Sequence, residues 1–382
     1  MDFDQSQIDW QSEKSLLLMN PQLHESEKND LQNLFRQFHK PGHFFIASSG
    51  SAQKENQSLK LIALSKKAIL ASATAVNEHL QVTTGDIWGL ALPVFHVGGL
   101  GILARSFQSG AQVVDALSNG KWDATTFLNI CESKGVTLSA LVPTQVFDLV
   151  QLGRPSPSKL RAIIIGGAEL SNELYQKARK LGFLVLPSYG MTEVASQIAT
   201  AEISSLKNDH YPQFKILSHC KVKVDSEKIL SIQSSAMMSG YGQIMDGEMK
   251  WFDQPSGSWY QTSDRGEIEN GYLKPLGRDE SFVKILGEGV DLNRLRDRLN
   301  QIITEMNPEL VLDVALVSRD DARRGHQLVF VCTKKISPDF LSELTLRYAA
   351  QSPKIEQWEN VIWVDQIPRS ALGKILWKDL KI

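Results

Sequence analysis

The stretch LPSYGMTEVASQIAT, residues 186–200, places an aromatic ring, a glycine, a hydroxyl and a carboxylate within five consecutive positions. It completes an apolar run typical of a strand, and open α/β sheets bind ligands at the carboxyl ends of their strands. Tyr189 could stack on a base there, and Gly190 would let the backbone approach a ligand closely. Thr192 could donate to a phosphate oxygen, and Glu193 could hold Mg²⁺. A strand-to-helix turn with a capping threonine would explain the same residues about as well.

A second candidate is a run of small residues after a β-rich segment, at Ser48, Ser49, Gly50 and Ser51. Exposed backbone N–H groups in such a loop can cradle phosphates. The Walker A pattern G-x-x-x-x-G-K-[ST] is absent. Taken by itself, the run is more typical of a polar hairpin loop.

Three further segments carry single candidate residues. Asp264, in WYQTSDRGEIE, follows a strand and could accept hydrogen bonds from ribose hydroxyls, although aspartate is equally common in turns. Arg278 follows Pro275 and Gly277 in a segment typical of a hinge. Near the C-terminus, Gly373 precedes Lys374 in a short loop, where a lysine is usually just solvated.

The elements that must position these groups alternate regularly over residues 121–200. Helical spacing in WDATTFLNICESKG, TQVFDLVQ and NELYQKARKLG alternates with the apolar runs VTLSALVP, RAIIIGG and FLVLP. Ser171 is the expected N-cap of the third helix, and Gly182 its stop. Strand–helix–strand repeats at this spacing predict a mostly parallel, right-handed α/β sheet. The glycines of GGAEL, residues 166–170, would then face the same crevice as the 186–200 stretch.

The pattern changes twice in the second half of the chain. From about residue 220, short alternating runs such as KVKVDSEKILSIQS and EMKWFD predict an antiparallel barrel or small sheet. After Arg278, a helical run LNRLRDRLNQIITEM, two strands, a helix and a last strand predict a compact α+β unit. We therefore expect an N-terminal domain over 1–277, β-rich from about 215, and a small mobile domain over 278–382.

Composition excludes several classes of function. The 382 residues are 42% apolar, and 41 basic against 43 acidic residues leave a net charge of −2. That balance predicts no nucleic-acid partner and no membrane-surface patch. Three scattered cysteines make a zinc site improbable. No apolar leader is visible in MDFDQSQIDW, and the uncharged run LALPVFHVGGLGILA is too short for membrane insertion, so we expect a cytoplasmic protein.

In their order, these segments resemble the signature series of the adenylate-forming acyl- and aryl-CoA synthetases. SYGMTEVASQIAT, LPVFHVGGL, LVPTQ and GEGV are most similar to the o-succinylbenzoate–CoA ligases of menaquinone biosynthesis within that superfamily. The resemblance implies two steps. A small-molecule carboxylate attacks the α-phosphorus of ATP, with Mg²⁺ bound, to give an acyl-adenylate. The thiol of coenzyme A then displaces AMP. The resemblance also allows a homodimer.

The resemblance also implies a role for each candidate residue. The triphosphate loop would comprise Ser48, Ser49, Gly50 and Ser51. Adenine and the acyl group would be surrounded by Gly167, Ala168, Glu169, Ser188, Tyr189 and Gly190. Thr192 and Glu193 would bind phosphate and Mg²⁺, with Glu193 as the metal ligand. Asp264 and Arg278 would hold the ribose.

Two more roles follow from the same resemblance. Lys374 would bridge the carboxylate and the α-phosphate, delivered by a C-terminal domain that turns about Asp279 or Glu280 between the steps. His96 would stand at the acyl pocket, although a hydrogen-bonded core histidine is an equal alternative.

The chain also departs from the superfamily's pattern. Ala52 and Gln53 replace a hydroxyl residue and a glycine in the serine-rich loop, and KENQS looks like an insertion before Lys60. The N-terminal part is shorter than in long relatives by roughly one hundred residues, the size of a subdomain. Two alternatives therefore remain: a ligase for another acyl or aryl acid, and a nucleotide-binding pseudoenzyme with an eroded phosphate loop.

Overall fold

The computed structural model describes residues 8–21, 23, 25–48, 60–208, 210–245, 248–278, 282–285, 288–307, 314–321, 325–334, 336–369, 375–376 and 380. The fold is mixed α/β, as predicted. Its contacts divide the chain into two compact units, Met1–Thr262 with Gly266–Pro275, and Ser263–Arg265 with Leu276–Ile382.

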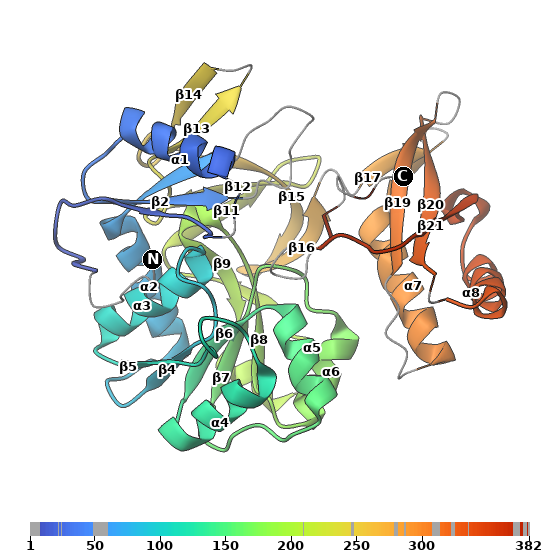
Figure 1. Cartoon of the computed structure of the whole chain (residues 1–382), viewed down its shortest axis with the longest axis horizontal. Helices are drawn as coiled ribbons and strands as arrows, with labels where there is room; N and C mark the ends of the chain where they lie inside the picture. The colour runs from blue at the N-terminus through green and yellow to red at the C-terminus, as the bar shows by residue number, and fades with distance from the viewer. Residues whose placement is uncertain are drawn as a thin grey trace. The chain divides into compact units, whose positions relative to one another are not determined.

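A large sheet dominates the described part of the chain (Figure 1). In order across it lie β11 (Cys220–Val224), β12 (Ile229–Ser234), β15 (Tyr260–Glu269), β16 (Tyr272–Arg278), β10 (Phe214–Ile216), β9 (Ser196–Ala201), β8 (Val185–Met191), β7 (Ala162–Ile165), β6 (Leu138–Leu141), β4 (Ile87–Leu90) and β5 (Gln112–Asp115). From β5 to β8 the neighbours pair in parallel, which confirms the prediction for residues 121–200. From β8 to β16 they pair antiparallel.

Five helices lie between residues 66 and 180 of the described chain. They are α2 (Lys66–Leu80), α3 (Val97–Ser109), α4 (Ala124–Lys134), α5 (Pro143–Leu152) and α6 (Asn172–Lys180). Ser171 caps α6 as predicted, because its hydroxyl accepts a hydrogen bond from the Leu174 amide at 3.2 Å. Between α4, α5, α6 and the sheet lies a core of fully buried side chains that includes Phe127, Leu149 and Ile163.

A smaller sheet in the first unit has the order β1 (Leu16–Leu18), β2 (His43–Ser48), β3 (Lys60–Ser65), β13 (Gly240–Met245) and β14 (Glu248–Asp253). Helix α1 (Glu25–Gln37) buries Leu31 and Leu34 against it. The strands predicted after residue 220 are antiparallel, but they divide between sheets. β11 and β12 extend the large one, whereas β13 and β14 extend the smaller one.

The second unit has its own sheet and core. Its strands are β17 (Phe282–Ile285), β18 (Glu288–Asp291), β19 (Val314–Asp321), β20 (Gly325–Thr333) and β21 (Asn360–Val364). Helix α7 (Leu292–Met306) coincides with the predicted run, and α8 (Pro338–Ala350) follows β20. Their apolar faces enclose a core that includes Leu299, Phe330 and Tyr348.

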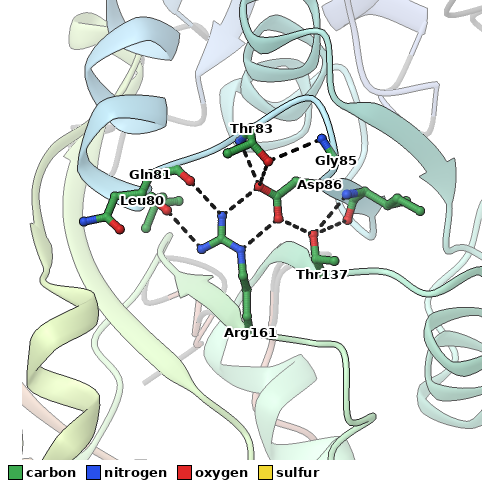
Figure 2. A network of polar contacts seen from close by, with 8 residues as sticks. Leu80, Gln81, Thr83, Gly85, Asp86, Thr137 and Arg161 are labelled. Atoms are coloured by element: carbon green, nitrogen blue, oxygen red, sulfur yellow. Dashed lines mark hydrogen bonds and ion pairs between the residues drawn. The ribbon is translucent and has the colours of Figure 1, made fainter.

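A polar network joins the amino ends of three parallel strands (Figure 2). Arg161, just before β7, donates from Nε to Oδ1 of Asp86 at 2.8 Å and from Nη2 to Oδ2 at 2.9 Å. Thr137, before β6, donates to Oδ1 at 2.7 Å, and Arg161 also donates to the Leu80 carbonyl at the end of α2. Burial alone would raise the pKa of Asp86, but these donors outweigh it and lower that pKa to about 2.

Within the described residues, no helix has the length and hydropathy needed to cross a membrane.

Candidate active site

The YGMTE segment forms the end of one strand and the turn into the next. β8 runs through Met191, a single 3₁₀ turn spans Thr192–Val194, and β9 then returns antiparallel to β8. The strand-to-helix alternative is therefore wrong, and the N-cap position of the turn belongs to Met191, which makes no side-chain cap. Ala195 follows with a φ of 49°. The turn thus places Thr192 and Glu193 at the carboxyl end of a strand in the parallel part of the sheet.

At Gly190 the structure shows a constraint besides the predicted one. A Cβ at this position would lie 1.8 Å from the carbonyl oxygen of Ser196, in the facing strand β9. The pairing of β8 and β9 also shifts register between Tyr189 and Gly190. The glycine is therefore required by the close approach of β9, because no side chain fits between the two backbones.

The two glycine-bearing strand ends are neighbours, as predicted. β7 pairs with β8 so that Ile165 stands opposite Pro187, and the Ser188 hydroxyl donates to the Ile165 carbonyl at 2.9 Å. Beyond β7, Gly167 has a φ of 81°, and it is exposed together with Ala168 and Glu169. Tyr189 is half-buried and packs against the cluster of Ala199, Leu230 and Leu273. The exposed loop 167–169 and the half-buried ring of Tyr189 together form a surface on which a planar ligand could lie.

Glu193 is linked to the smaller sheet. Its backbone carbonyl accepts a hydrogen bond from the Met238 amide at 2.8 Å, just before β13. Burial, and then the charge of Glu193, raise the pKa of Tyr241 on β13. The Lys60 ammonium lies over the Tyr241 ring, 4.6 Å from its centre. Carboxylate and ammonium thus border one aromatic ring, which suits a metal ion and phosphate oxygens bound side by side.

The donors fit Mg²⁺ that is brought in on phosphates. Among the described residues, no group of three or more His, Cys, Asp or Glu side chains could hold a metal ion. Mg²⁺ keeps several waters and typically takes one or two carboxylates together with substrate phosphates. A single carboxylate such as that of Glu193 would suffice for an ion bound in this way.

His96 stands where the chain leaves the large sheet and enters α3. It occupies the N-cap position with extended backbone angles, and no cap hydrogen bond from its side chain is formed. The imidazole is half-buried, with its ring centre 4.7 Å from that of Phe95. Because β4 precedes this loop directly, His96 lies beyond the carboxyl end of a parallel strand, on the side of the sheet that carries the YGMTE turn.

Arg105, in the third turn of α3, is a candidate site residue that the sequence reasoning missed. The residue is only 2% exposed, and its Nε and Nη1 have no hydrogen-bond partner among the described residues. Its guanidinium carbon lies 5.4 Å from the centre of the Trp88 ring, whose buried Nε1 is likewise unsatisfied. Burial lowers the pKa of Arg105 to about 10, so it stays charged at neutral pH. Three donors and a positive charge therefore meet in one buried place.

One signal in the sequence could have drawn attention to Arg105. It is the charged residue that ends the uncharged run LALPVFHVGGLGILA. In a helix packed this deeply, a lone arginine is either turned to solvent or held for a specific anion. Sequence periodicity does not separate these cases, because both place one charge on an otherwise apolar helix.

The other predicted residues are only partly placed. Asp264 is buried on β15, and Arg278 is the last residue of the neighbouring strand β16. Ser48 ends β2, which pairs antiparallel with the next described strand, β3. Outside the described residues lie Ser49, Gly50, Ser51, Asp279, Glu280 and Lys374. Their predicted roles stay predictions.

Comparison with known proteins shows which family this part of the chain resembles. The family described as AMP-binding enzyme matches residues 58–241, which span β3 to the start of β13 and include the YGMTE turn, His96 and Arg105. Residues 58–241, which match this family, are called the AMP-binding domain below. The residues gathered at the carboxyl ends of β4, β7 and β8 all belong to this AMP-binding domain.

Relatives of the AMP-binding domain include two curated ligases. The 2-succinylbenzoate–CoA ligase of Lactococcus lactis is 27% identical over 316 residues, 80% of this chain and 64% of that protein. The 2-succinylbenzoate–CoA ligase of Escherichia coli is 32% identical over 265 residues, 69% of this chain and 53% of that protein. The chain therefore spans less than two thirds of the length of either ligase.

Solved structures share the fold. The o-succinylbenzoate CoA synthetase of Bacillus subtilis, in complex with the acyl-adenylate intermediate OSB-AMP, superposes with a TM-score of 0.72 at 24% identity, covering 89% of this chain and 69% of that one. ATP-bound MatB from Rhodopseudomonas palustris reaches 0.71 at 19% identity, covering 88% and 67%.

Proposed function

We propose that this protein is an ATP-dependent acid–CoA ligase that converts o-succinylbenzoate, through its acyl-adenylate, to o-succinylbenzoyl-CoA. The AMP-binding domain supports the adenylate step, and the ligase relatives support the acid and the thiol. The observation that carries the identity of the acid is the buried guanidinium of Arg105.

An unpaired buried charge is costly, because desolvation of an ion costs several kcal/mol that only a partner can offset. In the described structure, Arg105 and Trp88 offer N–H donors to such a partner but no carboxylate is bonded to them. An acid with two carboxylates supplies such a partner, because one carboxylate reacts with ATP and the other binds Arg105. o-Succinylbenzoate has this chemistry, with a carboxylate on its ring and another on its succinyl chain.

Positions along α3 agree with an acid of that length. The guanidinium of Arg105 folds back to the level of Gly101, with Nη2 3.1 Å from where a Cβ of Gly101 would lie. Gly101 is five residues from His96, a rise of about 8 Å along the helix axis. The acid would then extend from the His96 end of α3 toward Arg105, with its reacting carboxylate beyond the strand ends.

The barrier to the first step is electrostatic, because a carboxylate must approach a polyphosphate. Lys374 would place its ammonium between the carboxylate and the α-phosphate, and Lys60 would neutralise the phosphates beside Tyr241. Mg²⁺, when bound with ATP at Glu193, would neutralise further phosphate charge. Thr192 would donate to a phosphate oxygen, and Asp264 and Arg278 would hold the ribose.

The test is incubation with ATP, Mg²⁺ and coenzyme A and a panel of acids, with pyrophosphate and thioester both measured. The panel contains o-succinylbenzoate, 4-oxo-4-phenylbutanoate, which lacks the ring carboxylate, and 2-butanoylbenzoate, which lacks the terminal one. We expect thioester from o-succinylbenzoate, and poor turnover of whichever monoacid keeps only the reacting group. Lys374→Ala should slow pyrophosphate release by a factor of hundreds while ATP binding persists.

The same panel separates the alternatives. A different acid that outperforms o-succinylbenzoate would replace the substrate and keep the reaction. Tight ATP binding without pyrophosphate release from any acid would support a nucleotide-binding pseudoenzyme. Arg105→Met adds a check on the acid's second carboxylate: it should raise KM for o-succinylbenzoate without lowering the melting temperature, because it removes a buried charge that has no partner in the described structure.

A further inference from the structure

We propose that Gly101 is a positioning residue for Arg105, and that its missing side chain sets the affinity of this site for a dicarboxylate. The inference rests on the proposed function, because it assumes that Arg105 binds the second carboxylate of the acid. In the proposed function, Gly101 has no assigned contact with ATP or with the reacting carboxylate.

Gly101 and Arg105 are one helical turn apart on α3, so their side chains share one face of the helix. A Cβ on Gly101 would lie 3.1 Å from Nη2 of Arg105, 3.5 Å from Cζ and 4.0 Å from Nε. Outside the helix's own backbone and the two chain neighbours, the three heavy atoms nearest to that point all belong to this one guanidinium. The space at Gly101 is therefore filled by the arginine of the next turn.

The ring of Trp88 bounds the guanidinium as well, with Cζ 5.4 Å from the ring centre. A planar cation held on an aromatic face and against its own helix keeps few alternative rotamers. Its remaining donors, Nε and Nη1, are those that no described residue satisfies. The arrangement therefore orders the donors before an acid arrives, and ordering in advance reduces the entropy lost on binding.

A methyl group at Gly101 would make the guanidinium give way by a few tenths of an ångström or more. Because alanine is a better helix former than glycine, Gly101→Ala should not weaken α3 itself. The change therefore separates the position of the donors from the stability of the helix. A purely structural role for Gly101 predicts a lower melting temperature, whereas a positioning role predicts weaker binding of the diacid alone.

The experiment is a double-mutant cycle in the full chain, with wild type, Gly101→Ala, Arg105→Ala and the combined variant. KM and kcat are measured for o-succinylbenzoate and for the monoacid that keeps the reacting carboxylate, beside the melting temperature of each variant. The matched control is Gly98→Ala, also in α3, where a Cβ would meet the flexible end of the Leu92 side chain at 3.0 Å.

We expect Gly101→Ala to raise KM for the diacid about tenfold, the factor for losing one charge-assisted hydrogen bond, with kcat and the melting temperature little changed. In the Arg105→Ala background the same change should have no effect on KM, since no guanidinium is left to displace. The ratio of diacid to monoacid KM in Gly98→Ala should match wild type.

Two failures are distinguishable. A wild-type chain that makes no thioester from o-succinylbenzoate overturns the proposed function and this inference with it. A normal wild type in which Gly101→Ala leaves the diacid KM unchanged, or changes it equally with and without Arg105, overturns the inference alone.

Discussion

A methyl group on Gly190 would overlap a backbone carbonyl, whereas one on Gly101 would press on a side chain. The two glycines illustrate different constraints at the residue scale. The first keeps two strands close together, because the Ser196 oxygen belongs to a hydrogen-bonded backbone that cannot rotate away. The second leaves room for a charged side chain, whose end can give way without moving the backbone. We therefore expect substitution at Gly190 to affect folding, and substitution at Gly101 to affect binding.

Gly190→Ala should destabilise the protein by about 3 kcal/mol or more, the upper range for overpacking, because β9 must shift to accept the new atom. Thermal and denaturant unfolding measure the change. Gly85→Ala is a suitable control, since a Cβ there makes only an ordinary contact of 3.7 Å with Thr83. Equal stability of the two variants would contradict the proximity of β8 and β9 described here.

At the scale of elements, the two ends of the parallel strands have different structural roles. The carboxyl ends of β4, β7 and β8 lead into His96, Gly167 and the YGMTE turn. The amino ends of β4, β6 and β7 are tied together by Asp86, Thr137 and Arg161 (Figure 2). A rigid amino end holds the strands in register, so that the loops at the opposite end can carry ligand contacts without also holding the sheet.

Asp86→Asn should cost about 2 kcal/mol of unfolding free energy at pH 7, because the folded pKa of Asp86 is about 2 against an ordinary value of 3.8. A depressed carboxyl pKa stabilises the fold above the unfolded pKa, and that contribution is lost as pH falls toward the folded one. The difference between wild type and variant should thus shrink to about half by pH 3. Denaturant unfolding between pH 7 and pH 3 measures it.

Arg161→Met provides a second route to the same measurement, since it removes the main donors to Asp86 while leaving the carboxylate. Its cost should follow the same pH dependence. A penalty for Asp86→Asn that stays constant down to pH 3 would show that the variant acts through packing and not through the charge.

On the scale of the whole molecule, the chain divides into two units whose apolar cores are distinct. Ile163 belongs to the core beneath α4, α5 and α6, and Phe330 to the core enclosed by α7 and α8. Both side chains are fully buried. Units with separate cores can unfold in separate transitions, since the loss of one core does not expose the other.

Calorimetry should accordingly resolve two transitions. Phe330→Ala should lower the midpoint temperature of one transition, because it reduces the free energy of unfolding of that unit by about 3–5 kcal/mol. Ile163→Ala should lower the midpoint temperature of the other, through a loss of about 2–5 kcal/mol. Under the proposed function, ATP binding by the first unit should survive Phe330→Ala at temperatures below the transition that this variant lowers. A single transition that both substitutions lower equally would show that the two units unfold as one.

Local interactions explain why much of the architecture could be predicted. A serine before a helical run caps it whatever lies elsewhere in the chain, and Ser171 does so. The α7 run has its apolar residues on one face, and the helix coincides with that run. Neighbouring apolar strands separated by single helices pair in parallel because the crossover allows little else. The order of the motifs likewise indicated the AMP-binding family domain.

The sequence alone thus determined the helices and parallel strands of residues 121–200 and the helix α7, because each depends on residues close together in the chain. Only the tertiary structure decided that Gly190 makes room for β9, that antiparallel strands after residue 220 divide between two sheets, and that Arg105 is buried beside Trp88. The physical reason is that burial and close approach are properties of pairs distant in sequence. A glycine or an arginine carries no local mark of the neighbour that folding will bring to it.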